Sequence, residues 1–142
     1  FSHQHLVNDV FGFGIQNYDE LKEVMDSAPS KVVLSINGHE HVDFAHKYDG
    51  RWFYSLMSGT NMFMGTKHPS KGKYTEEYMK SLPCIHQVAP YSKTQYGIFT
   101  LDEKGARVAK TEGEFVGKSP LEWGYPEGER FLPYVTEKYF EF

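Results

Sequence analysis

The feature that most constrains the fold is a helix-forming segment followed, after a short loop, by a β-branched run. Residues 17–28, NYDELKEVMDSA, begin with the N-cap candidate Asn17, carry Glu20 at the capping-box position and end before Pro29. Residues 31–36, KVVLSI, are typical of a strand covered on both faces. This order predicts a layered α/β fold. The apolar stripe of the helix is expected to comprise Leu21, Val24, Met25 and Ala28.

The rest of the chain predicts mainly strands and irregular structure. Residues 58–92 are expected to be mostly irregular, with a short helix over 75–82 that begins at Thr75 and stops at Pro83. A loop region this long is more often functional than idle. The expected hairpins are 42–46 with 52–57, around an Asp-Gly turn, and 96–101 with 107–110, around DEKG.

The 142 residues suffice for one ordinary domain. We expect residues 1–118 to form it and residues 119–142, an aromatic-rich extension, to pack on this domain or on a partner, a second copy of the chain included. The opening residues, FSHQHL, suggest the C-terminal piece of a longer protein.

Composition narrows the class of ligand. The net charge of −4 argues against broad nucleic-acid binding, which relies on a basic face. A phosphorylated substrate would therefore need local cations, which a bound metal supplies. The single cysteine, Cys84, excludes a Cys-rich zinc module, so a metal would depend on His, Asp, Glu and Asn. No apolar run approaches the roughly 18 residues of a membrane span, and nothing indicates a cellular compartment.

Two histidines stand where the buried strand ends, in the string GHEH at residues 38–41. In an extended segment, His39 and His41 would project to one side, with Glu40 turned away. Gly38 would let the backbone turn tightly and approach a ligand closely. Ligands of α/β sheets bind outside the carboxyl ends of strands, so this is a reasonable place for a metal.

A third histidine is expected at the same edge. His3, in SHQHL, stands at what looks like the end of another strand, and one helix of crossover length separates it from the GHEH string. Two neighbouring parallel strands would thus deliver three imidazoles, which core packing does not readily explain.

With these motifs the chain resembles the calcineurin-like metallophosphoesterases. The C-terminal half of that family has a strand ending in Ser-His, a helix, a strand ending in Gly-His-x-His and then antiparallel strands. The resemblance covers residues 1 to about 101 in order and spacing, although only the two histidine motifs are specific. It implies an α/β sandwich of two sheets flanked by helices, of which this chain forms the C-terminal portion.

The resemblance also implies a two-metal site that hydrolyses a small phosphorylated substrate. The two divalent ions would be manganese, iron, zinc or similar. His3 and His39 would bind one ion and His41 the other. His5 would be a neighbour that contacts substrate or only packs, and Asn61 would line the site or belong only to a turn.

The chain departs from the family pattern in one respect. The motifs Asp-x-His, Gly-Asp-x-x-Asp and Gly-Asn-His-Glu or Asp are absent, and the family has them upstream. Three imidazoles alone do not hold two divalent ions at the required spacing. The catalytic residues are therefore expected in a missing N-terminal half, and this chain alone is expected to be inactive.

Two alternatives stay open. His3, His5, His39 and His41 could form a closed structural zinc or nickel site in a non-catalytic module, since four nitrogen ligands satisfy tetrahedral zinc. The chain could instead be an aromatic-rich interaction domain. The single histidines His46, His68 and His86 are assigned surface or loop roles, and Asp43 is either a residue orienting an imidazole or an exposed strand carboxylate.

Overall fold

The structure, a computed structural model, describes residues 1–7, 14–65, 74–125 and 130–142. It is a small mixed α/β fold, mostly sheet with few helices, as the sequence predicts at this level. The first half contains α1 (Tyr18–Ser27), β1 (Leu34–Asn37), β2 (Phe44–Tyr48), β3 (Arg51–Ser55) and β4 (Asn61–Phe63). The second half contains α2 (Glu76–Ser81), a 3-10 turn (Ile85–Gln87), β5 (Val88–Pro90), β6 (Phe99–Asp102), β7 (Gly105–Val108) and β8 (Lys138–Glu141).

The first sheet has the strand order β1-β3-β2, with β1 parallel and β2 antiparallel to β3. The predicted hairpin of β2 and β3 is confirmed. Its loop is Asp49 and Gly50, both with positive φ (50° and 75°), as a two-residue turn that matches the twist of the strands requires.

The N-terminal segment extends this sheet beside β1. Ser2 forms a parallel bridge with Asn37, the Ser2 amide donates to the Ile36 carbonyl at 3.1 Å, and the Gly38 amide donates to the His3 carbonyl at 3.1 Å. The prediction that the two histidine-bearing segments run parallel at one edge is therefore confirmed. The backbone places His3 next to the end of β1.

Helix α1 forms where predicted, but its packing differs from the expected stripe. Only Met25 is buried, and Val24 is 65% exposed. Asn17 makes no side-chain capping bond to the backbone; its amide donates to the Glu20 carboxylate at 3.4 Å. The helix is instead attached by ion pairs of Asp26 with Arg51 at the start of β3, so charge as well as burial positions it.

The second sheet has the order β6-β7-β8 and joins residues 99–108 to residues 138–141. The hairpin around DEKG is confirmed. The aromatic C-terminal segment packs on the domain itself, because β8 is a strand of this sheet and Phe140, at 1% exposure, lies in the core. The sequence analysis missed β8, whose alternation KYFE is too short to stand out.

The segment predicted to be irregular holds a third, two-stranded sheet. Strands β4 and β5 pair antiparallel over three residues each, which is too short for a periodic signal. The helix expected over 75–82 is confirmed as α2, where the Thr75 hydroxyl accepts from the Tyr78 amide at 3.2 Å.

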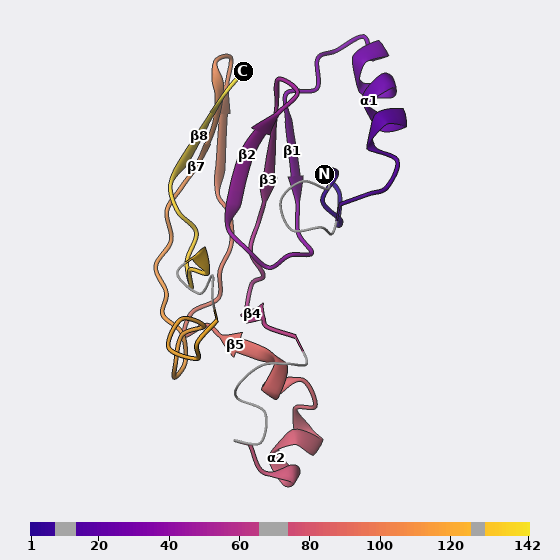
Figure 1. Cartoon of the computed structure of the whole chain (residues 1–142). Coiled ribbons are helices and arrows are strands. Elements are labelled where there is room, and N and C mark those ends of the chain that lie inside the picture. The colour runs from indigo at the N-terminus through magenta and orange to yellow at the C-terminus, as the bar shows by residue number, and fades with distance from the viewer. Residues whose placement is uncertain (8–13, 66–73, 126–129) are drawn as a thin grey trace.

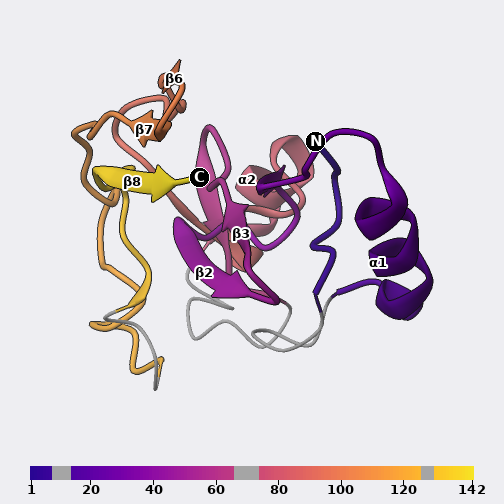
Figure 2. The same cartoon turned by 90° about the horizontal axis from the view of Figure 1, so that it is seen from above.

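The elements form layers. Sheet β1-β3-β2 lies between α1 on one side and sheet β6-β7-β8 on the other, while β4, β5 and α2 extend from one end (Figures 1 and 2). Rings join the two larger sheets: Tyr54 packs against Phe99 and Phe140, with centroids 5.9 and 5.4 Å apart.

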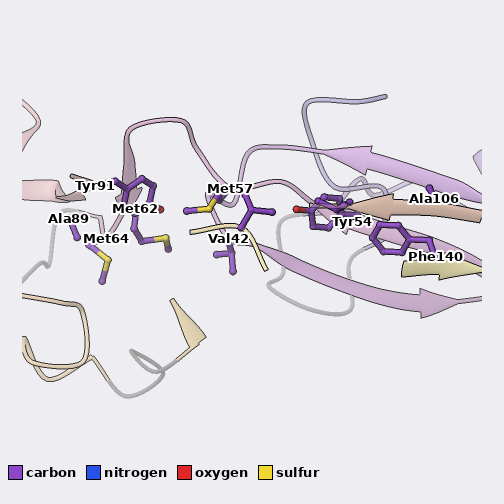
Figure 3. Packing of buried hydrophobic residues seen from close by; sticks show 11 residues of the cluster. Val42, Tyr54, Met57, Met62, Met64, Ala89, Tyr91, Ala106 and Phe140 are labelled. Atoms are coloured by element: carbon purple, nitrogen blue, oxygen red, sulfur yellow. The ribbon is translucent and has the colours of Figure 1, made fainter. Parts of the chain in front are cut away.

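One apolar core runs from the two packed sheets to the β4-β5 end. Figure 3 shows Val42 and Met57 between a group around Tyr54 and Phe140 and a group around Met62. The loop that carries the GHEH string enters this core at Val42, so a buried side chain anchors it. Among the described residues no helix is long and apolar enough to cross a membrane.

Candidate functional site

Two of the predicted ligands meet at the end of β1. His39 Nδ1 lies 3.2 Å from His3 Nε2, and the two rings stand edge to face with centroids 5.1 Å apart. Both residues are exposed, so the pair is open to solvent. The contact depends on the parallel pairing of residues 36 apart in sequence, and it fulfils the expectation that His3 and His39 share an edge.

The backbone of the GHEH string is not extended, which corrects one premise of the prediction. His39 and His41 both have positive φ (72° and 58°), a region that residues other than glycine rarely occupy. Gly38, expected to make the turn, does not have positive φ. The histidines themselves carry the unfavourable conformation, which costs about 1–2 kcal/mol per residue. Such conformations are concentrated at functional sites.

The Glu40 side chain is directed at the sheet. Its Oε2 atom accepts from Asn37 Nδ2 and from Ser55 Oγ, each at 3.0 Å. The Glu40 amide also donates to the Gly38 carbonyl at 3.0 Å. Glu40 thus fastens the tight turn that carries His39 and His41 to β1 and β3.

His41 is half-buried and lies beside Asn61 of β4 and against Phe63, with ring centroids 6.3 Å apart. Burial lowers the pKa of the His41 imidazole, contact with Asn61 opposes this, and positive charge on His39 and His3 lowers the pKa further. The neutral form, which binds metals, is therefore favoured. His41 Nδ1 is buried and has no hydrogen-bond partner among the described residues.

We call His3, His39 and His41 the histidine rim. The spacing of its nitrogen atoms decides whether it fits a metal ion. Two nitrogens bound to one tetrahedral zinc ion lie roughly 3.3 Å apart, and the His3 and His39 nitrogens are 3.2 Å apart. That spacing also fits a hydrogen bond between two neutral imidazoles. The pair fits two positions around one ion.

The rim does not provide a complete metal centre. Within residues 1–7, 14–65, 74–125 and 130–142, no group of three or more His, Cys, Asp or Glu side chains is arranged to hold an ion. The nearest carboxylate along the chain, that of Glu40, is already held by Asn37 and Ser55. Further ligands would have to come from outside this set.

His5 has a packing role, which removes it from the predicted substrate contacts. Its side chain is 2% exposed, stacks on His46 of β2 at 5.3 Å and 13°, and packs near Phe53. Its Nδ1 atom lies 2.7 Å from the Val7 carbonyl. A closed zinc site of four histidines is therefore not assembled, because His5 faces the interior. His46, assigned to the surface, belongs to the same buried stack.

Asp43 joins the chain's two halves. Its carboxylate, 1% exposed, accepts from Tyr54 Oη at 2.7 Å, from the Thr136 amide at 2.8 Å and hydroxyl at 2.7 Å, and from Lys138 Nζ at 2.5 Å. We call Asp43, Tyr54, Thr136 and Lys138 the Asp43 cluster. Burial, and then the charge of Asp43, raise the pKa of Tyr54 far above its ordinary value. Neither role predicted for Asp43 is the observed one.

The remaining candidates belong to other segments of the chain. His86 is half-buried in the 3-10 turn before β5, and Cys84 is exposed. His68 lies outside the described residues.

A pocket of about 390 Å³ opens beside the rim. Its wall is formed by the loop after β1, by β4 and by the C-terminal segment, and the sequence analysis did not foresee it because these parts are distant along the chain. The lining residues are His39, Glu40, Val42, Met62, Phe63, Met64, Gly65 and Phe131.

No protein-family model, curated protein or solved structure matches this chain. The site is therefore interpreted from its own geometry.

Proposed function

We propose that this chain contributes the histidine ligands of a two-metal centre that hydrolyses phosphate esters, with a fold like that of the calcineurin-like metallophosphoesterases. The observation that carries the proposal is the 3.2 Å approach of His39 Nδ1 to His3 Nε2 at the ends of neighbouring parallel segments. Sheet edges of this kind are where α/β proteins bind their ligands.

Three further observations support a ligand site over simple packing. The rim combines two histidines with left-handed backbone conformations, an exposed pair of rings and a half-buried imidazole whose lowered pKa favours the neutral form. A histidine that only packs in a core needs neither a left-handed backbone nor an exposed ring against a second imidazole. Asn61, predicted to line the site, lies next to His41, so a polar amide is available at the rim.

The proposal assigns separate tasks to the residues. His3 and His39 would hold one ion, His41 would take part in holding the second, and carboxylate ligands would come from outside the described residues. The ions, when bound, supply charge stabilisation on the phosphoryl oxygens and lower the pKa of water. Glu40 fastens the turn that carries His39 and His41 to β1 and β3 through Asn37 and Ser55.

The test is whether metal and phosphate binding depend on the rim. Isothermal titration of the chain with zinc or manganese, followed by inorganic phosphate, should give metal binding that His3→Ala and His39→Ala each weaken. Phosphate binding should require the metal.

His86→Ala is the matched control, since it removes a histidine that is not one of the three rim residues. Metal binding that is equally strong in the His39→Ala and His86→Ala variants would refute the proposal. Phosphate binding of equal strength with and without metal would also contradict it.

A further inference from the structure

The pocket beside the histidine rim is mainly apolar, whereas the rim itself is polar. Val42, Met62 and Met64 are 5–7% exposed and belong to the apolar core, where Figure 3 shows the two methionines near each other. Phe63, 48% exposed, is at the open side. A volume of about 390 Å³ is within the range of small-molecule sites.

Among the described residues, polar side chains line the pocket only at the turn after β1. They are those of His39 and Glu40, and the Glu40 carboxylate already accepts hydrogen bonds from Asn37 and Ser55. A hydroxyl-rich group placed among the methionines would lose its hydrogen bonds to water and gain few in return. The pocket therefore selects against sugars.

We propose that this pocket binds the apolar alcohol part, aromatic or alkyl, of a phosphate ester whose phosphate group lies at the histidine rim. The inference rests on the proposed function and specifies its substrate class. His39 belongs to both places: its Nδ1 atom faces His3, and the residue also lines the pocket. A ligand with an anionic head and an apolar body fits this arrangement, whereas a nucleotide or sugar phosphate does not.

Phe63 is the residue expected to distinguish such ligands. Its ring packs 6.3 Å from that of His41 and lines the pocket, so it touches both the rim and the apolar space. Because the side chain is largely exposed, Phe63→Ala should leave the fold intact. Phe142→Ala, at an exposed phenylalanine after β8, is the matched control.

The experiment uses the chain labelled with ¹³C at its methionine methyl groups, with zinc present. Phenylphosphonate, which is not hydrolysed as an ester, should shift the signals of Met62 and Met64 and leave those of Met25 in α1 and Met79 in α2 in place. Methylphosphonate has the same head without the ring and should bind about tenfold more weakly. Phe63→Ala should weaken the binding of phenylphosphonate by about tenfold, whereas Phe142→Ala should leave it unchanged.

Two results would overturn the inference, and they are distinguishable. If phenylphosphonate and methylphosphonate bind equally and leave the Met62 and Met64 signals unmoved while zinc-dependent phosphate binding persists, the pocket assignment fails and the proposed function stands. If phenylphosphonate binds no more tightly than benzyl alcohol, with or without zinc and in His39→Ala as well, and zinc-dependent phosphate binding is also absent, the phosphate-ester assignment fails together with the proposed function.

Discussion

The Asp43 cluster and the histidine rim are separated by one residue, Val42, yet they differ in what each can do. In the cluster, both carboxylate oxygens of Asp43 accept hydrogen bonds, and its side chain is almost completely buried. In the rim, two residues hold left-handed conformations, two rings are exposed, and His41 Nδ1 has no partner among the described residues.

A structural polar cluster and a binding site differ in whether their polar atoms can still bind a ligand. A buried group that is fully hydrogen-bonded has no capacity left for a ligand, and its loss leaves its partners unpaired. A residue with a strained backbone conformation and a polar atom that can still bind a ligand contributes little to the free energy of folding. Ligand binding explains such a residue better than stability does. The cluster should therefore respond to mutation in stability, and the rim in binding.

The largest expected effect is the loss of the Asp43 carboxylate. Asp43→Ala would leave Tyr54, Thr136 and the Lys138 ammonium without their acceptor, so the free energy of unfolding should fall by about 3–5 kcal/mol. Urea denaturation measures this change. Asp19→Ala, at an exposed aspartate in α1, is the control and should cost no more than about 1 kcal/mol. A similar loss of unfolding free energy in both variants would contradict the special role of the Asp43 cluster in stability.

The next effect concerns ligand binding at the rim. His39→Ala should lower the affinity for zinc by about 100-fold, because loss of even an outer-shell partner of a ligand costs 10–100-fold. Its free energy of unfolding should change by less than about 1 kcal/mol, since the side chain is exposed. Calorimetric titration and urea denaturation give the two numbers. If His39→Ala loses stability but keeps its zinc affinity, the rim acts in folding and not in binding, which contradicts the proposal.

A pH experiment tests the cluster further. The pKa of Tyr54 is raised in the folded state, so above about pH 10 the unfolded chain releases the proton while the folded chain retains it. Stability from this group is fully present below pH 10 and should fall by about 1.4 kcal/mol per pH unit above it. Denaturation of the native chain and of Tyr54→Phe at pH 8 and pH 11 measures this. The stability advantage of the native chain should shrink at pH 11; an unchanged advantage would contradict the assignment.

Relief of backbone strain at His39 should raise the free energy of unfolding, by a smaller amount than the loss expected for Asp43→Ala. His39→Gly should raise the free energy of unfolding above that of His39→Ala by about 1 kcal/mol, because glycine accepts a φ of 72° without penalty. Both variants should lack tight zinc binding. Thermal denaturation compares them. Equal stability of the two variants would mean that the left-handed conformation costs nothing.

The smallest effect is expected at His86. His86→Ala should leave zinc affinity within a few fold of the native value, since this histidine is not one of the proposed ligands. Titration under the conditions used for His39→Ala provides the comparison. A loss as large as that of His39→Ala would show that the rim is misplaced.

Much of the local structure could be predicted from the sequence because each signal was local. The Asp49-Gly50 turn, α1, α2 and the hairpin of β6 and β7 follow from capping, turn residues and periodicity. The approach of His3 to His39 was also predictable, because parallel segments joined by a helix bring their ends to one edge.

What the sequence did not reveal depends on contacts between distant residues. Asp43 looks like any strand carboxylate until Thr136 and Lys138, more than 90 residues away, meet it in space. His5 looks like a site residue until His46 stacks on it. The conformation of the GHEH turn was misjudged because Glu40 finds acceptable partners in Asn37 and Ser55 only once β1 and β3 have paired.

The most direct test of the central claim is anomalous X-ray diffraction from a crystal of the chain soaked with zinc. The account predicts a peak bound by both His3 Nε2 and His39 Nδ1, within about 2.3 Å of each atom. Zinc bound elsewhere with no peak between these two atoms, or rings of residues 3 and 39 that point apart, would contradict it.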